Sequence, residues 1–239
     1  MPKKWLKIDP HVHSKGVSLC SRVTCEQIID EKIKLGYDGI VLTNHCQPWY
    51  YTHDRHSEFI EQIIAEFQQG KVYADQRNFR FYLGIEVSLT EPHYADWLLY
   101  GVTEEFLRKS PCLYKLTQKE LFDYCQQWGV LMVQAHPYRQ SPCEPKYMHG
   151  VEINCSNEDL DKVTLVEDFA KKNNLLITCG TDYHFVEKTF HGGIYVPRDC
   201  ETAADIARWI CENGKIKVFF GGQWIAAAAD KNFHAPEFS

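Results

Sequence analysis

The chain has 239 residues, of which 44% are hydrophobic and 24% charged, which provides material for a sizeable core and excludes a disordered polymer. Its 26 lysines and arginines against 32 aspartates and glutamates give a net charge of −6, which argues against a long nucleic acid as partner. No apolar run approaches the roughly 18 residues of a membrane span. Residues 1–10 also lack the apolar core of a signal peptide, so we expect a cytoplasmic protein with reduced cysteines and no membrane attachment.

Short apolar runs alternate with longer segments of helical periodicity, a pattern typical of an α/β fold. Seven runs predict strands at residues 6–9, 39–43, 79–85, 97–100, 130–135, 150–154 and 175–179. They are nearly continuous in apolar character, as in a parallel sheet that helices cover on both faces. We expect a single domain over residues 1–239, with a motif-bearing core at about 6–196 and a C-terminal helix and tail at 200–239. A closed or nearly closed β/α barrel is the preferred architecture, and an open doubly wound sheet is the alternative.

Local signals place helices between these strands. Two capping-box pairs predict where helices begin: Thr24 with Gln27, and Thr117 with Glu120. An apolar stripe that includes Ile33 should face the core from the first helix, and Gly70 should end the second. A last helix is predicted around residues 203–210.

Nearly every predicted strand ends in a residue that can bind a metal ion. These residues are His11, His13, His45, Glu86, His136, Asp182 and His184. In a parallel barrel all such strand ends lie on one face, which is where β/α enzymes build their sites. Imidazole and carboxylate ligands together favour Zn, Fe or Mn. Because the set is too large for one shell of about four ligands, it indicates two or three ions.

The motifs around these residues resemble those of the PHP (polymerase and histidinol phosphatase) phosphoesterases. They are Asp9-Pro10-His11-Val12-His13-Ser14, Thr43-Asn44-His45, Gly84-Ile85-Glu86-Val87, Ala135-His136-Pro137, Gly150-Val151-Glu152-Ile153-Asn154 and Gly180-Thr181-Asp182-Tyr183-His184. The resemblance implies a distorted (β/α)7 barrel with its metal site at the carboxyl ends of the strands. One ion would be held by His11, His13, Glu86 and Asp182, a second by Glu86 and His136, and a third by His45 and His184.

The chain departs from the family pattern at three places. Asn44 stands where many members carry aspartate. The stretch after the first motif, where members often supply a further ligand, offers Cys20 instead, so the third ion is either weakly held or bound with Cys20 as a substitute ligand. For the second ion the additional ligand is either His93 or Asp96, and the sequence does not choose between them.

Substrate contacts are expected around this centre. A water activated by the ions would be the nucleophile, with His184 and Asp182 acting beside it in catalysis. Candidates for binding the phosphate are Arg139, just after the His136 motif, and then Arg22, Arg198 and His191. Aromatic residues 49–51 could stack on a flat ring. Glu152 and Asn154 are expected to support the ligands, and His149 and His234 to lie on the surface.

The expected substrate is a small phosphate monoester, and histidinol phosphate is the named candidate. The alternative is a nucleotide phosphatase or a 3′/5′ exonuclease acting on nucleoside bisphosphates or short oligonucleotides. An amidohydrolase would also use His-x-His and aspartate at barrel strand ends, but it would place a lysine at a strand end, and no predicted strand ends in lysine. A metal-binding barrel without catalysis is the remaining alternative. The sequence gives no indication of an oligomeric state.

Overall fold

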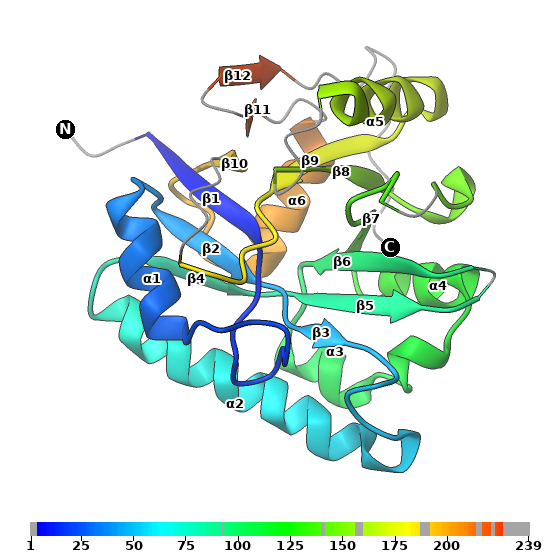
Figure 1. Cartoon of the computed structure of the whole chain (residues 1–239), viewed down its shortest axis with the longest axis horizontal. Helices are drawn as coiled ribbons and strands as arrows, with labels where there is room; N and C mark the ends of the chain where they lie inside the picture. Colours follow the sequence, from blue (N-terminus) through cyan, green and yellow to red (C-terminus); the bar gives the residue numbers. More distant parts are fainter. Residues whose placement is uncertain are drawn as a thin grey trace.

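The strands form two six-stranded sheets, which lie beside each other in Figure 1. The computed structural model describes residues 4–91, 93–139, 142–155, 160–186, 192–213, 217–220 and 223–226. The first sheet has the order β12 (Gln223–Ala226), β11 (Lys217–Phe220), β10 (Gly192–Pro197), β1 (Trp5–Val12), β2 (Gly39–Leu42) and β4 (Arg80–Leu83). The second has the order β3 (His45–Cys46), β5 (Ile85–Leu89), β6 (Ala95–Tyr100), β7 (Leu131–Gln134), β8 (Gly150–Asn154) and β9 (Leu176–Gly180).

The mixed α/β class is confirmed, but a single closed parallel sheet is not found among the described residues. Strands β1, β2 and β4 are parallel, as are β7, β8 and β9. In contrast, β6 pairs antiparallel with both β5 and β7, and β10 pairs antiparallel with β1. Only residues 90–94 join β5 to β6, which is too short for the crossover that a parallel pair requires. A further hairpin, β11–β12, was not predicted.

The two sheets approach each other where β1 lies beside the segment that follows β9. An isolated parallel bridge joins Val12 to Tyr183, and the His13 N–H donates to the Tyr183 carbonyl at 3.0 Å. We call this junction the seam. It brings the first and last predicted metal-binding motifs side by side, although about 170 residues separate them in the sequence.

Helices pack against both sheets. They are α1 (Cys25–Lys34), α2 (His56–Asp75), α3 (Glu104–Lys109), α4 (Gln118–Gln127), α5 (Leu160–Asn173) and α6 (Ala203–Asn213), with short 3-10 turns at His53–Arg55, Leu113–Lys115 and Pro145–Tyr147. Both predicted capping boxes are present, at the starts of α1 and α4. Figure 1 shows α1 and α2 packed beside β2 and β4. Of the described helices, none has the length and apolar character needed to cross a lipid bilayer.

Two predicted details of the helices are wrong. Helix α2 continues past Gly70 to Asp75, and a Cβ at Gly70 would lie 2.6 Å from the Phe81 ring, so this glycine allows α2 to approach β4 closely. In α1, Ile33 is 40% exposed, whereas its neighbour Lys32 is fully buried. The buried apolar face of α1 therefore lacks Ile33, and Lys32 is buried instead.

His149 was expected on the surface, and it is instead buried at the start of β8. Its side chain is 6% exposed and packs against the Phe122 ring with the centroids 4.8 Å apart. Its Nδ1 accepts a hydrogen bond of 3.0 Å from the backbone N–H of Met132. The acceptor role requires a neutral ring, because a protonated imidazole has no lone pair to offer. Burial lowers the pKa of His149 to about 4.

We expect acidification to destabilise the protein through His149. The unfolded chain binds the proton with an ordinary histidine pKa of about 6.5, above that of the folded state. The stabilising contribution is therefore complete above that pH and is lost as the pH falls toward 4, by on the order of 3 kcal/mol. Urea unfolding of the metal-free wild type and His149→Gln, at about pH 7 and pH 4.5, measures it. The variant should lose less stability than the wild type; equal losses would contradict the assignment.

Candidate metal centre

The fold brings the seven strand-end residues together at the seam. His11 lies in β1 and His13 directly after it, His45 is in β3, and Glu86 is in β5. His136 follows β7, and Asp182 and His184 follow β9. All seven side chains are buried or nearly so, although they are polar. Buried polar groups in such number require partners, because leaving them without any costs free energy.

The carboxylate of Glu86 occupies the middle of the cluster. Its Oε1 lies 3.4 Å from His11 Nε2 and 3.2 Å from His136 Nε2. Its Oε2 lies 3.4 Å from His13 Nε2 and 2.7 Å from His45 Nδ1. Each oxygen thus faces two imidazoles, which is the arrangement of a carboxylate that bridges two ions.

Asp182 closes the cluster from the other side of the seam. Its Oδ1 lies 3.3 Å from Nε2 of both His11 and His13. The backbone at Asp182 has φ +51°, and that at His136 has φ +30°, in the left-handed region that residues with a Cβ seldom adopt. Strained backbone of this kind persists when the surrounding contacts hold the residue in place, and it is found most often at functional sites.

Hydrogen bonds to the far side of the rings leave their inner nitrogens aimed at the centre. His11 Nδ1 donates to Glu152 Oε1 at 2.8 Å, His13 Nδ1 lies 3.4 Å from Ser18 Oγ, and His184 Nδ1 donates to the Asp182 carbonyl at 2.8 Å. A neutral imidazole that donates from Nδ1 presents a lone pair at Nε2. Metal-binding histidines are oriented in this way by their outer partners.

The inner atoms fit metal ions. Apart from their contacts with one another and with Asp182 and His136 in the cluster, His11 Nε2, His13 Nε2, His45 Nδ1 and both Glu86 oxygens are buried and have no hydrogen-bond partner in the described part of the chain. The donor atoms form four groups, and within each group they lie within 4.8 Å of one another. The groups are His13, His45 and His184; His11, His136 and Asp182; His11, His13 and Glu86; and Glu86, Asp96 and His136. A divalent ion of intermediate softness, such as Zn, would give these lone pairs a partner.

When no ion is bound, protons neutralise part of the negative charge of the carboxylates in the cluster. Burial lowers the pKa of His11, but Glu152, Asp182 and Glu86 outweigh it and raise the pKa well above the ordinary value. Burial raises the pKa of Glu86, yet His45 and His11 hold it well below the usual range. Burial, with His45 and His184 beside it, lowers the pKa of His13. Metal ions bind the deprotonated forms, so they compete with protons here.

A second layer of buried groups supports the ligands. Glu152 Oε2 accepts hydrogen bonds from the His136 N–H at 3.1 Å and from Asn154 Nδ2 at 3.0 Å. Asn44 Oδ1 accepts from the Ser14 N–H at 2.8 Å and from Ser18 Oγ at 2.9 Å, so it fixes the turn after β1 without a negative charge. Glu152 and Asn154 were expected to support the ligands, and in the structure Glu152 contacts His11 and the His136 backbone while Asn154 donates to Glu152.

A support that the sequence reading missed is the buried pair of Lys32 and Asp9. Lys32 Nζ lies 2.5 Å from Asp9 Oδ2 and donates to Thr181 Oγ1 at 3.1 Å. Asp9 also accepts from the backbone N–H of Thr181 at 3.1 Å and of His11 at 3.3 Å. The pair therefore anchors both the segment that ends in Asp182 and the one that carries His11. No motif spacing indicates it.

Of the three additional ligand candidates, the structure brings two to the centre. Asp96 Oδ2 lies 4.0 Å from His136 Nε2 and groups with Glu86. His93 lies elsewhere, with Nε2 3.3 Å from Cys143 Sγ. Cys20 Sγ lies 3.1 Å from His184 Nε2. Burial raises the pKa of the Cys20 thiol, but hydrogen bonds from His184 and His45 lower it to about 6.

The phosphate-binding candidates separate clearly. Arg139 Nη2 donates to Asp182 Oδ2 at 2.9 Å, so this guanidinium lies at the rim of the centre. Arg22 is exposed and lies over the Phe185 ring at 5.3 Å. Arg198 follows β10 at the far end of β1, where its N–H donates to the Lys4 carbonyl, so a role in binding phosphate is not supported. His191 and His234 lie outside the described residues.

An open hollow of about 560 Å³ leads to the centre. It is lined by Leu19, Cys20, His45, Gln47, Trp49, Tyr50, Tyr94, Asp96, His136, Arg139, Asp182 and His184. Among these lining residues Arg139 is the only arginine or lysine. Trp49, 58% exposed, stacks on Tyr94 with the centroids 5.9 Å apart, which gives the mouth a flat aromatic side.

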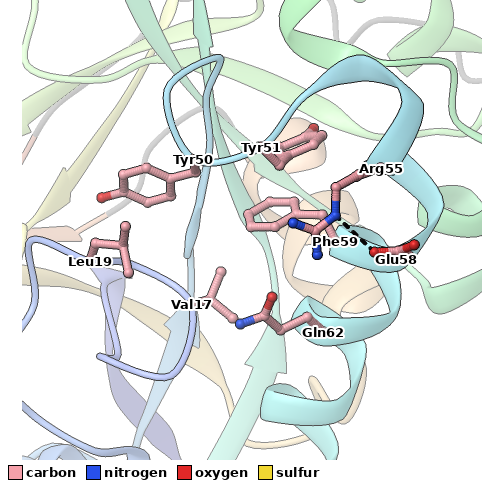
Figure 2. Close-up of a pocket in the computed structure, with 8 residues that line it drawn as sticks. All are labelled: Val17, Leu19, Tyr50, Tyr51, Arg55, Glu58, Phe59 and Gln62. Atoms are coloured by element: carbon pink, nitrogen blue, oxygen red, sulfur yellow. Dashed lines mark hydrogen bonds and ion pairs between the residues drawn. The ribbon is translucent and has the colours of Figure 1, made fainter.

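A smaller hollow of about 200 Å³ adjoins the mouth and shares Leu19 and Tyr50 with it (Figure 2). Tyr51, Phe59 and Val17 are among the residues that line it. The one guanidinium that lines it, Arg55, is paired with Glu58 at 2.9 Å. Of the two arginines that line these hollows, it is therefore Arg139, in the larger hollow, that lies beside a predicted metal ligand.

Comparisons with known proteins establish the fold. No family model matches the sequence, and no curated protein matches it. Among solved structures, the chain is similar to a two-domain protein from Bacteroides vulgatus ATCC 8482 that contains a predicted PHP-like metal-dependent phosphoesterase, with a TM-score of 0.67 and 19% identity over 93% of this chain and 66% of that one. This chain therefore spans slightly less than two thirds of that protein.

Two further solved structures are similar in fold. PsfC from Pseudomonas syringae PB-5123 has a TM-score of 0.62 at 18% identity, over 86% of this chain and 88% of its own. An amidohydrolase from Chromobacterium violaceum, with bound sulfate and no metal, has a TM-score of 0.55 at 15% identity, over 74% and 87%. The expected likeness to PHP-type proteins is thus confirmed at the level of the fold.

Proposed function

We propose that this chain is a metal-dependent phosphoesterase that hydrolyses a small phosphate monoester, with histidinol phosphate as the named candidate. The observation that carries the proposal is Glu86, whose two buried oxygens each face two imidazoles. We propose that His11, His13, His45, Glu86, His136, Asp182 and His184 hold two or three divalent ions of Zn, Mn or Fe, with Asp96 as a further ligand. When bound, such ions supply an acidified water as nucleophile and positive charge for the phosphoryl oxygens.

The chain's own residues supply orientation and charge. Glu152 fixes His11 by holding its Nδ1 proton. Asp182 positions Arg139 at the rim, where its guanidinium can meet a phosphate oxygen. His184 Nδ1 is engaged by the Asp182 carbonyl, so only its Nε2 faces the hollow, where it either holds an ion or passes a proton to the leaving group.

The size and surface of the hollow favour a small substrate. About 560 Å³ is within the range of roughly 300–1,000 Å³ that is common for small-molecule sites. The net charge of −6 and the single lining arginine do not suit a long nucleic acid. The stacked rings of Trp49 and Tyr94 favour a second candidate, a nucleotide phosphatase or exonuclease acting on nucleoside bisphosphates or short oligonucleotides, because they offer a flat ring a surface on which to stack.

Metal loading followed by a substrate panel tests the proposal. The chelated protein is loaded with Zn, Mn or Fe, and bound metal is measured. Turnover is then compared on histidinol phosphate, nucleoside bisphosphates, short oligonucleotides and an amide substrate. We expect metal-dependent release of phosphate, which Asp182→Ala lowers by about 100-fold or more. Bound metal without turnover on any phosphate ester would overturn the catalytic claim, and turnover on the amide alone would indicate an amidohydrolase.

A further inference from the structure

Two hydroxyl groups hold Asp96, the further ligand proposed for the second ion beside Glu86 and His136. Tyr94 stands just before β6 and Asp96 lies within it, two residues on, so both side chains point to one face. The antiparallel register of β5 and β6 sets Ser88 directly opposite Asp96. The Tyr94 hydroxyl donates to Asp96 Oδ1 at 2.9 Å, and Ser88 Oγ donates to the same oxygen at 2.6 Å. Strand alternation and sheet pairing thus bring both donors to one carboxylate oxygen.

These two bonds decide which oxygen of Asp96 faces the metal centre. Because Oδ1 accepts from both hydroxyls, Oδ2 is the oxygen that faces His136, at 4.0 Å from its Nε2. Asp96 is 5% exposed and Ser88 is fully buried, so solvent has little access to this carboxylate. Burial and the charge of Glu86 raise the pKa of Asp96, whereas His136 and the two hydroxyl donors oppose that rise. Hydrogen bonds that favour the ionised carboxylate favour the form that binds a cation.

The ring of Tyr94 belongs to the mouth of the larger hollow as well. It lines the hollow together with Asp96 and stacks on Trp49, with the centroids 5.9 Å apart and the ring planes at 25°. Trp49 is 58% exposed and comes from the loop that follows β3. One side chain thus contacts a candidate metal ligand through its hydroxyl and an exposed aromatic residue through its ring. A shift of Asp96 on binding an ion would therefore reach Trp49 through Tyr94.

We propose that Tyr94 is a positioning residue that couples the second ion to the mouth of the hollow. Its hydroxyl, with that of Ser88, holds Asp96 so that Oδ2 faces the position of the second ion. Its ring transmits the occupancy of that position to Trp49, at the entrance for substrate. The proposal rests on the metal centre of the proposed function and adds how one ligand is held and what its ion controls. Removing a hydrogen-bonded partner of a metal ligand commonly weakens metal binding by about 10- to 100-fold.

Metal binding by Tyr94→Phe tests the positioning role without any need for turnover. This change removes the hydroxyl and keeps the ring that stacks on Trp49. The chelated full chain is titrated with Mn or Zn by calorimetry, and the ion that Asp96→Asn loses identifies the second position. We expect Tyr94→Phe to bind that ion about 10-fold or more weakly and the others as the wild type does. Tyr73→Phe is the matched control and should bind every ion normally, because its hydroxyl donates to a carboxylate at 2.9 Å between the outer helices α1 and α2.

Fluorescence of Trp49 tests the coupling. Its signal is the difference between each protein and the same protein carrying Trp49→Phe, recorded during the same titration. We expect this signal to change as the second ion binds to the wild type, and to stay constant in Tyr94→Phe even at saturating metal.

A second variant and a folding control separate the possible outcomes. Ser88→Ala removes the other donor and should weaken the same ion, and circular dichroism establishes that each chelated variant folds. Unchanged affinity in both Tyr94→Phe and Ser88→Ala, or an equal Trp49 response with and without the Tyr94 hydroxyl, would overturn the inference while leaving the metal centre in place. A wild type that binds no divalent ion would overturn the proposed function as well.

Discussion

Replacing Glu86 with glutamine should lower metal-dependent turnover by about 100-fold or more and remove at least one bound ion. Glu86 is fully buried, and each of its oxygens faces two imidazoles. Glutamine keeps the volume but replaces one oxygen by an amide NH2, which cannot bind a cation, and removes the negative charge that the two ions would share. Among the described residues, Asp182 belongs to a separate donor group with His11 and His136, and Asp96 is already a member of the group that Glu86 forms with His136, so neither carboxylate is spare to supply the lost oxygen.

Metal content by mass spectrometry and turnover by phosphate release measure this effect. The matched control is Glu144→Gln, which removes the same charge from an exposed loop before β8 and should leave both quantities within about twofold of the wild type. Circular dichroism of the chelated proteins establishes that both variants fold. A Glu86→Gln protein with full metal content and wild-type turnover would show that Glu86 does not bridge ions.

The Lys32→Met variant should lose on the order of 3 to 5 kcal/mol of stability, because it leaves the buried carboxylate of Asp9 without its cation. Both residues are 0% exposed, and Lys32 also lies over the Tyr183 ring at 4.2 Å. Methionine matches the length of the lysine stem but cannot neutralise a charge. Since Asp9 holds the segments of His11 and Asp182, the metal-free centre should loosen along with the global loss.

Urea unfolding of the chelated protein measures this second effect. Lys34→Met is a matched control in the same helix, because Lys34 is 67% exposed and pairs only with Glu31 at the surface, and it should change stability by less than about 0.5 kcal/mol. Adding Asp9→Asn to Lys32→Met should recover part of the loss, since the unpaired charge is gone. A Lys32→Met protein as stable as the Lys34→Met control would show that the buried pair contributes nothing.

The candidate ligands could be predicted because their signal is local. A strand that ends in a histidine or a carboxylate is visible in the chain itself, as at His45 and Glu86, and parallel neighbours bring such ends together. The capping boxes of α1 and α4 were equally accessible, because each is completed within four residues. Both kinds of feature need only short-range geometry.

Features that depend on distant partners could not be predicted. Lys32 reads as a surface residue in the α1 pattern, and only the approach of Asp9 and Thr181 makes its burial favourable. Gly70 reads as a helix end, yet it is retained inside α2 because the Phe81 ring packs against it. Asp96, rather than His93, lies near Glu86 because the antiparallel pairing of β6 with β5 places Asp96 beside Ser88, on the side of the sheet that carries Glu86.

The metal ions proposed for the seam would have a second consequence, for the solubility of the chain. Val12 and Tyr183 form the single bridge there, and the residues on either side of them are His11, His13, Asp182 and His184. Ions bound between these neighbours would hold together two backbone segments that, among the described residues, are joined by one isolated bridge. Unsealed strand edges are templates for pairing with other chains. Loss of the proposed ions would then leave these segments open to pairing with other chains, so the metal-free protein is expected to aggregate more readily.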